Sequence, residues 1–437
     1  MMSIRDRDAV WAVPLAAALL LWPAVWNLYP IAFADTGTYL SQAIHRYLGW
    51  DRPPFYSLFM LPLHMTLSTW PVVAVQALLA VWVVRLVCRT LLPGMRARWL
   101  LLVVLPLAVG TWLPFLVCQL MPDVFTPLLV LVLCVLASCP VKPEDDGKNA
   151  APVAFAAFAI AAQQSSLLLS VAVIPLLSIT RGGMTRGRLL APPILAIAAL
   201  LTVNLIGHGR LAISPFGNVF LLARVIYDGP GMDILKRDCP AAGWRLCPFL
   251  DRFPPTSDEF LWRPDSPIVL AGGHKAVSAE AGAIIAAALR AEPGRELRAV
   301  RRNAAEQLTH FASGDGLEAW PIEVTPWIER DFPPAERTRY AAGLQARGLL
   351  VLPPWLEALH AVVSLAGVAA CIALLPLAMR RRHKAAAFLV VTLVVLPASA
   401  VITGGLSTPH DRYQSRIMWL PPFVAALSAT ALLRRPA

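Results

Sequence analysis

Charged residues are scarce in this chain. Asp, Glu, Lys and Arg together make up 15% of the 437 residues, whereas hydrophobic residues make up 57% and the mean hydropathy is +0.61. Soluble domains carry about 25% charged residues, so this deficit argues against an ordinary soluble protein. Several apolar runs approach the roughly 20 residues that span a bilayer, and we therefore predict a multi-pass membrane protein.

Three further absences narrow the class. No small-residue cleavage pattern follows the first apolar run, so no cleavable signal is expected. No internal repeat relates two halves of the chain, and the apolar segments hold almost no charge, which weighs against an ion-coupled transporter. The net charge of +11 does not indicate a nucleic-acid partner, because most basic residues outside the largest loop lie in short clusters between apolar segments.

These basic clusters predict the topology by the positive-inside rule. Arg5 and Arg7 precede the first apolar segment, Arg380 to Lys384 form the strongest cluster, and Arg434 and Arg435 end the last segment. We expect about ten transmembrane helices in the inner membrane of a bacterium, with both termini cytoplasmic. The expected segments lie near residues 10–28, 70–90, 99–118, 124–139, 150–180 (two helices), 189–206, 355–378, 385–402 and 417–433.

The stretch 150–180 is counted as two helices because basic residues flank it on both sides. Lys148 precedes it and Arg181 follows it, and both belong in the cytoplasm, so an even number of crossings is required. The polar residues 163–166 (QQSS) are the expected break. Such a break is tolerated where it faces protein or a water-filled cavity.

The expected domains are an N-terminal transmembrane module (1–208), a periplasmic domain (209–352) and a C-terminal transmembrane module (353–437). The middle domain is rich in Pro, Gly and charge and is predicted to be mixed or mainly helical. Within it, residues 295–311 form a plausible amphipathic helix with Leu297, Val300, Leu308 and Phe311 roughly on one face.

Two cysteines, Cys239 and Cys247, are the only ones in this middle domain, since the other five lie in or beside apolar segments. An oxidising periplasm favours a disulfide between them, and two buried free thiols are the alternative. In either case the pair is expected to be structural.

Polar chemistry gathers in three loops that the topology places outside. The first offers Asp35 with Tyr39, Arg52 and Tyr56, and the second offers Asp123. The last offers a run of polar side chains: His410, Asp411, Arg412, Tyr413 and Arg416. Carboxylates at a membrane boundary can deprotonate a hydroxyl group or bind a divalent cation, and arginines can bind phosphate oxygens with paired donors. Together these groups suit group transfer from a lipid phosphate.

Each of these residues also has a structural interpretation. Asp35 and Asp123 both precede expected helices and could cap them by accepting a backbone N–H. Arg412 and Arg416 could extend to the headgroup region as interfacial anchors. His410 has no clear set of metal ligands near it in the sequence.

The order of these motifs resembles the GT-C superfamily of membrane glycosyltransferases. Asp35 and Tyr39 followed by the run from Arg52 to Tyr56 (RPPFY) is similar to the first-loop pattern, and Pro122-Asp123 is similar to the second. The likeness is to the bacterial branch with the aminoarabinose and lipopolysaccharide-core transferases, and more distantly to protein O-mannosyltransferases. Many members carry a second acidic residue beside the first-loop Asp, where this chain has Thr36 and Gly37.

The resemblance implies an inverting hexosyl- or pentosyltransferase with a polyprenyl-phosphate-linked sugar as donor. The acceptor would be an envelope glycan, lipid or protein, with Asp35 as the general base and Asp123 as a second catalytic carboxylate. Tyr39, Arg52, Tyr56, His410, Arg412, Tyr413 and Arg416 would bind substrate or the donor phosphate. No cofactor is assigned; a divalent cation, Mg or Mn, would be held by Asp35 and Asp123 if one is used. A transporter or flippase for a lipid-linked substrate, with the break at 163–166 on its path, and a non-catalytic envelope assembly factor are the alternatives.

Overall fold

Helices account for all the regular structure in the described part of the chain, which comprises residues 4–138, 146–179 and 183–434 of a computed structural model. Over those residues there is no named strand, and the one isolated bridge pairs Ile31 with Gln119 in parallel. The expectation of an all-α fold is therefore confirmed for the described residues.

Five helical stretches are long and apolar enough to cross a bilayer. They are Trp70–Leu91 (α5), Thr185–His208 within α11 (Gly183–His208), Pro354–Arg380 (α20), Ala385–Gly405 (α21, Ala385–Ala400, and η6, Val401–Gly405) and Asp411–Leu433 (α22, Asp411–Met418, and α23, Leu420–Leu433). A bent pair at 257–270 and 274–291 would add a sixth. The other expected segments form shorter helices, so the count of ten crossings stays a prediction.

Two of the shorter helices begin with a proline in their first turn, although α1 and α6 also contain an interior proline, Pro14 and Pro106. The expected first segment divides into α1 (Ile4–Leu19) and α2 (Trp22–Asn27), with Pro23 in the first turn of α2. The expected third segment divides into α6 (Leu100–Gly110) and α7 (Leu113–Cys118), with Pro114 in the first turn of α7. Proline is tolerated in a first turn but interrupts a helix interior, because it lacks an N–H and clashes with the preceding turn. The expected break at 163–166 is confirmed, because α9 (Asp146–Ala162) ends just before it and α10 begins within it (Ser165–Ser178).

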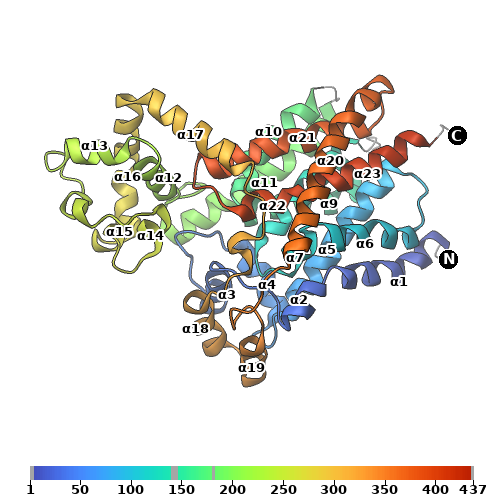
Figure 1. The fold of residues 1–437 in the computed structure, drawn as a ribbon, viewed down its shortest axis with the longest axis horizontal. Coiled ribbons are helices and arrows are strands. Elements are labelled where there is room, and N and C mark those ends of the chain that lie inside the picture. The colour runs from blue at the N-terminus through green and yellow to red at the C-terminus, as the bar shows by residue number, and fades with distance from the viewer. Residues whose placement is uncertain (1–3, 139–145, 180–182, 435–437) are drawn as a thin grey trace.

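The helix α8 (Phe125–Ser138) lies at the centre of the largest core, and its residues are buried along its whole length. A helix that is hydrophobic all round is expected to be enclosed by other helices. It packs against α5, α9, α10 and α11, and α23 packs mainly against α20 and α21. The beginning of α1 and the end of α23 lie at one end of the molecule, opposite α13 to α15 (Figure 1).

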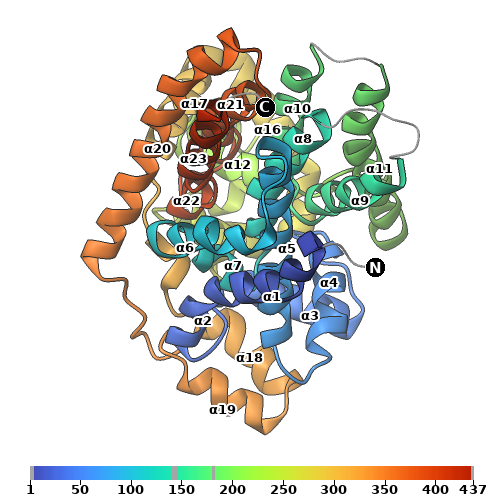
Figure 2. The same cartoon turned by 90° about the vertical axis from the view of Figure 1, so that its right-hand side faces the viewer.

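The segment between α11 and α20 has two differently packed parts. The helices α12 to α16 lie together at one side of the molecule (Figure 1), and they have a hydrophobic core of their own. Their bounds are Asn218–Tyr227 (α12), Gly231–Asp238 (α13), Ser257–Trp262 (α14), Pro267–Leu270 (α15) and His274–Ala291 (α16). The helices α18 (Pro321–Asp331) and α19 (Pro334–Ala342) instead pack onto the core of the membrane helices, below α3 (Thr36–His45) in Figure 2. Which side of the membrane this segment occupies stays a prediction.

A buried carboxylate fixes α19 to the membrane helices. Glu336 Oε1 accepts hydrogen bonds from the Tyr29 hydroxyl at 2.9 Å and from the Thr69 N–H at 2.9 Å. The Thr69 and Ser68 hydroxyls donate to the same oxygen at 3.2 and 3.3 Å. Four donors on one oxygen compensate for removing this charge from water, so the contact is a specific anchor.

The expected amphipathic helix exists as α17 (Pro293–Gln307), but its predicted apolar face is only partly covered: Val300 and Phe311 are half-buried. Leu297 is 59% and Leu308 41% exposed, while Glu296, Asn303 and Gln307 are buried. Specific partners account for the burial of these polar side chains: Glu296 pairs with Arg224, and Asn303 donates to Asp228 at 2.6 Å. Cys239 and Cys247 form the expected disulfide in the α12–α16 part, with a Cα–Cα distance of 5.4 Å.

Candidate active site

Asp35 lies between two arginines at the start of α3. Its Oδ1 accepts a hydrogen bond from Arg52 Nη2 at 2.8 Å, and its Oδ2 lies 3.6 Å from Arg412 Nη1. Arg412 also lies over the Phe33 ring, 4.1 Å from the centroid. Asp35 does precede α3, as the capping interpretation requires, but its side chain makes no capping hydrogen bond. Both carboxylate oxygens are directed at arginines instead.

These neighbours decide the ionisation of the loop-one carboxylates. Burial opposes the charge on Asp35, but Arg52 and then Arg412 outweigh burial and hold its pKa below the usual range. Burial dominates at Asp51 and raises its pKa, although Arg52 acts in the opposite direction. The surroundings therefore favour the ionised form of Asp35 and disfavour that of Asp51.

Asp123 and Arg416 form a second ion pair. Arg416 Nη1 donates to Asp123 Oδ1 at 2.9 Å, and both side chains are at most 3% exposed. The interpretation of Arg416 as an interfacial anchor is therefore wrong, because its guanidinium is enclosed by protein. Its Nη2 lies 3.4 Å from Ser165 Oγ at the start of α10. The polar break at residues 163–166 thus reaches this pair, a contact that sequence reasoning did not foresee.

The first two loops are joined through their backbones. The Ile31 N–H donates to the Cys118 carbonyl at 2.9 Å, and the Leu120 N–H donates to the Ile31 carbonyl at 2.8 Å. Buried Gln76 holds the second loop by donating to the Val117 and Gln119 carbonyls at 2.8 and 2.9 Å. These bonds fix where Asp35 and Asp123 lie relative to each other.

The predicted tyrosines and His410 are placed around these pairs with different partners. Tyr56 is fully buried and donates to Gln76 Oε1 at 2.7 Å. Its hydroxyl therefore holds Gln76, the residue that binds the second loop. Tyr39 packs edge-to-face on Tyr56 with ring centroids 5.0 Å apart. The Tyr413 ring lies 5.0 Å from the Arg412 guanidinium carbon. His410 Nε2 lies 3.6 Å from Asp258 Oδ2.

No group of three or more His, Cys, Asp or Glu side chains that could hold a metal ion occurs among the residues that the structure describes. Asp35 and Asp123, the two ligands expected if a cation is used, each face arginine. Whether the protein uses Mg or Mn stays an open prediction.

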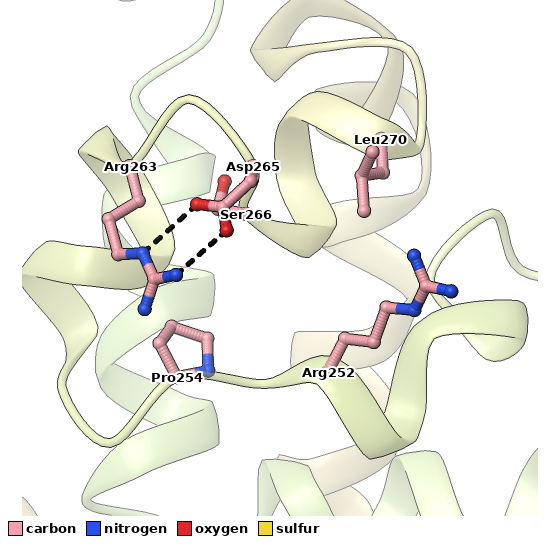
Figure 3. Close-up of a pocket in the computed structure, with 6 residues that line it drawn as sticks. All are labelled: Arg252, Pro254, Arg263, Asp265, Ser266 and Leu270. Atoms are coloured by element: carbon pink, nitrogen blue, oxygen red, sulfur yellow. Dashed lines mark hydrogen bonds and ion pairs between the residues drawn. The ribbon is translucent and has the colours of Figure 1, made fainter.

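A separate pocket of about 240 Å³ lies in the α12–α16 part, with six residues around it: Arg252, Pro254, Arg263, Asp265, Ser266 and Leu270. Arg263 donates two hydrogen bonds to Asp265, at 3.0 and 2.8 Å (Figure 3). None of the predicted site residues lines this pocket.

Comparisons of the chain with protein-family models, with curated proteins and with solved structures gave no match. The resemblance to the GT-C superfamily therefore rests on the residues named above. The class supported by the fold is an α-helical membrane protein, and the function is a matter for the proposal that follows.

Proposed function

We propose that this protein is a GT-C-type glycosyltransferase that moves a sugar from a polyprenyl-phosphate donor to an envelope glycan, lipid or protein. The observation that carries the proposal is the convergence of Asp35, Arg52 and Arg412 from two loops far apart in the sequence. A carboxylate beside two arginines provides a proton acceptor and a phosphate site within one cluster.

In the proposed reaction, Asp35 takes the proton from the acceptor hydroxyl as the oxygen attacks the anomeric carbon. The bond from that carbon to the phosphate oxygen breaks on the opposite face, and the electron pair leaves with the lipid phosphate. The configuration is therefore inverted. The phosphate gains negative charge as it leaves, which a nearby arginine stabilises more strongly in the transition state than in the ground state.

Arg412 is well suited to bind that phosphate. Its Nη1 is buried and makes no hydrogen bond within the described part of the chain, with Asp35 Oδ2 at 3.6 Å. A bound phosphate would draw the arginines away from Asp35 and so make this carboxylate more basic when the donor is present.

The test is transfer of radiolabelled sugar from native polyprenyl-phosphate donors to envelope acceptors, with and without Mg or Mn. Asp35→Asn is expected to lower kcat by about 10² to 10⁴-fold, the usual contribution of a general base. Asp331→Asn is the matched control, because Asp331 is also a buried, ion-paired carboxylate, bound to His45 at 2.9 Å. Its variant should keep wild-type transfer.

Full transfer by folded Asp35→Asn would refute the assignment of the base. If the wild type transfers no sugar from any donor, the glycosyltransferase proposal fails. Movement of lipid-linked sugar across proteoliposomes would then be measured, and Ser165 at the polar break would be the first residue to vary, because it contacts Arg416.

A further inference from the structure

Two buried glutamines of the segment between α11 and α20 bind the loops that carry Asp35 and Arg412. Gln307 ends α17, and Gln345 follows α19. Their exposed fractions are 0% and 5%. Neither residue is in the chemistry proposed above, and a buried carboxamide is costly unless its donor and acceptor are both satisfied.

Each glutamine pairs with both backbone groups of a single residue. Gln345 Oε1 accepts from the Ala32 N–H at 2.8 Å, and its Nε2 donates to the Ala32 carbonyl at 2.7 Å. Gln307 Oε1 accepts from the His410 N–H at 3.0 Å, and its Nε2 donates to the His410 carbonyl at 2.8 Å. His410 is extended, with φ −142° and ψ 144°, so its N–H and carbonyl point to the same side.

A carboxamide fits this arrangement because it presents one acceptor and one donor side by side. A carboxylate has no donor, and an apolar side chain has neither group. Leu or Met at either position would leave a backbone N–H and a carbonyl buried without partners. The two glutamines therefore hold the backbones of Ala32 and His410 specifically.

We propose that Gln307 and Gln345 are positioning residues that set the separation of Asp35 from Arg412. Ala32 lies just before Asp35 in the chain, and His410 just before Arg412. The two held backbones thus place the two charged groups that lie 3.6 Å apart. By this inference, two side chains of the segment between α11 and α20 support the active site through the backbones of its loops.

Two other contacts join the same segment to the last loop, and a third holds Gln345 in place within the segment. The Ala312 N–H donates to Asp411 Oδ1 at 3.0 Å, beside Arg412. Gln345 Nε2 also donates to the Glu318 carbonyl at 2.8 Å, which fixes the Gln345 side chain within its own segment. A Cβ on Gly404 would lie 2.6 Å from Cβ of Gln307, so this glycine allows α17 to approach closely enough to reach His410.

The first part of the test does not depend on the proposed function. Backbone hydrogen exchange is measured on the full-length protein in nanodiscs, for wild type, Gln307→Met and Gln345→Met. Exchange should become faster around Ala32 in Gln345→Met and around His410 in Gln307→Met. Asn204→Leu is the control, because Asn204 Nδ2 donates to the Ala212 and Ile213 carbonyls at 2.8 and 3.0 Å, outside these loops. It should leave both regions unchanged.

The second part of the test rests on the proposed transferase reaction. Both Met variants are expected to lose about 100-fold in kcat with little change in KM, because small displacements of catalytic groups have effects of that size. The acidic limb of the rate–pH profile should move to higher pH as Arg412 separates from Asp35, whose pKa Arg412 lowers. In Gln345→Glu the activity relative to wild type should fall as pH rises, since only the protonated carboxyl offers both a donor and an acceptor to Ala32.

Unchanged exchange at Ala32 and His410 in the Met variants would overturn the positioning role. The same follows if Asn204→Leu loses as much kcat as the Met variants, because general destabilisation would then explain the loss. A wild type without transfer activity would refute the proposed function, and the exchange experiment would still decide the positioning role.

Discussion

The buried pair of Asp123 and Arg416 allows a structural role to be separated from a catalytic one. Both side chains are at most 3% exposed and are joined at 2.9 Å. Removing one member leaves the other charge buried without a partner, which costs about 3 to 5 kcal/mol in comparable pairs. Arg416→Met and Asp123→Leu should therefore each lower the temperature of unfolding substantially.

The double variant Asp123→Leu/Arg416→Met should recover most of that stability. Replacing both members of a buried pair by apolar groups of similar size is often neutral or stabilising. The expected coupling energy between the two substitutions is then about 3 kcal/mol or more, by comparison with the cost of one unpaired charge.

Thermal unfolding in detergent and sugar transfer are measured on the same four proteins, namely wild type, both single variants and the double variant. Recovery of stability without recovery of transfer would support a role for the pair in the reaction. Recovery of both would show that Asp123 is a structural carboxylate and would remove it from the catalytic residues. Single variants that unfold at the wild-type temperature would refute the desolvation argument itself.

Three further changes address other parts of the structure. Arg412→Gln removes one of the two cations that lower the pKa of Asp35, so this pKa should rise. The acidic limb of the rate–pH profile should then move to higher pH. An acidic limb that does not move would exclude Arg412 from the environment of the base. Replacing Cys239 and Cys247 by Ser should destabilise the α12–α16 part by about 2 to 3 kcal/mol, as expected for a disulfide that closes a short loop. Proteolysis of this part should therefore become faster. An unchanged rate of proteolysis would contradict the stabilising role of the disulfide. Glu336→Leu leaves several buried donors without a partner, at a cost of about 1 to 3 kcal/mol each. The protein should therefore unfold at a clearly lower temperature. An unchanged temperature of unfolding would show that this contact is dispensable.

Local sequence features predicted the helices well where length and hydrophobicity alone decide them. The predicted limits of α5 and α20 agree with the structure to within about two residues, the usual uncertainty of helix ends. The break between α9 and α10 followed from charge parity and a polar run. The helix α17 was found from its periodicity, but its buried face was not, because Glu296, Asn303 and Gln307 are buried by partners distant in the sequence.

The candidate site likewise combines features that the sequence predicts with contacts that only the fold creates. The sequence by itself determined that the chain is an apolar, helical membrane protein and that carboxylates and arginines gather in a few short loops, since composition and residue order carry that information. Only the tertiary structure decided which charges pair: Asp35 with Arg52 and Arg412, and Asp123 with Arg416. Gln307 and Gln345 carry no local signal of their roles, because their partners are backbone groups that any sequence possesses and that only the fold brings within reach.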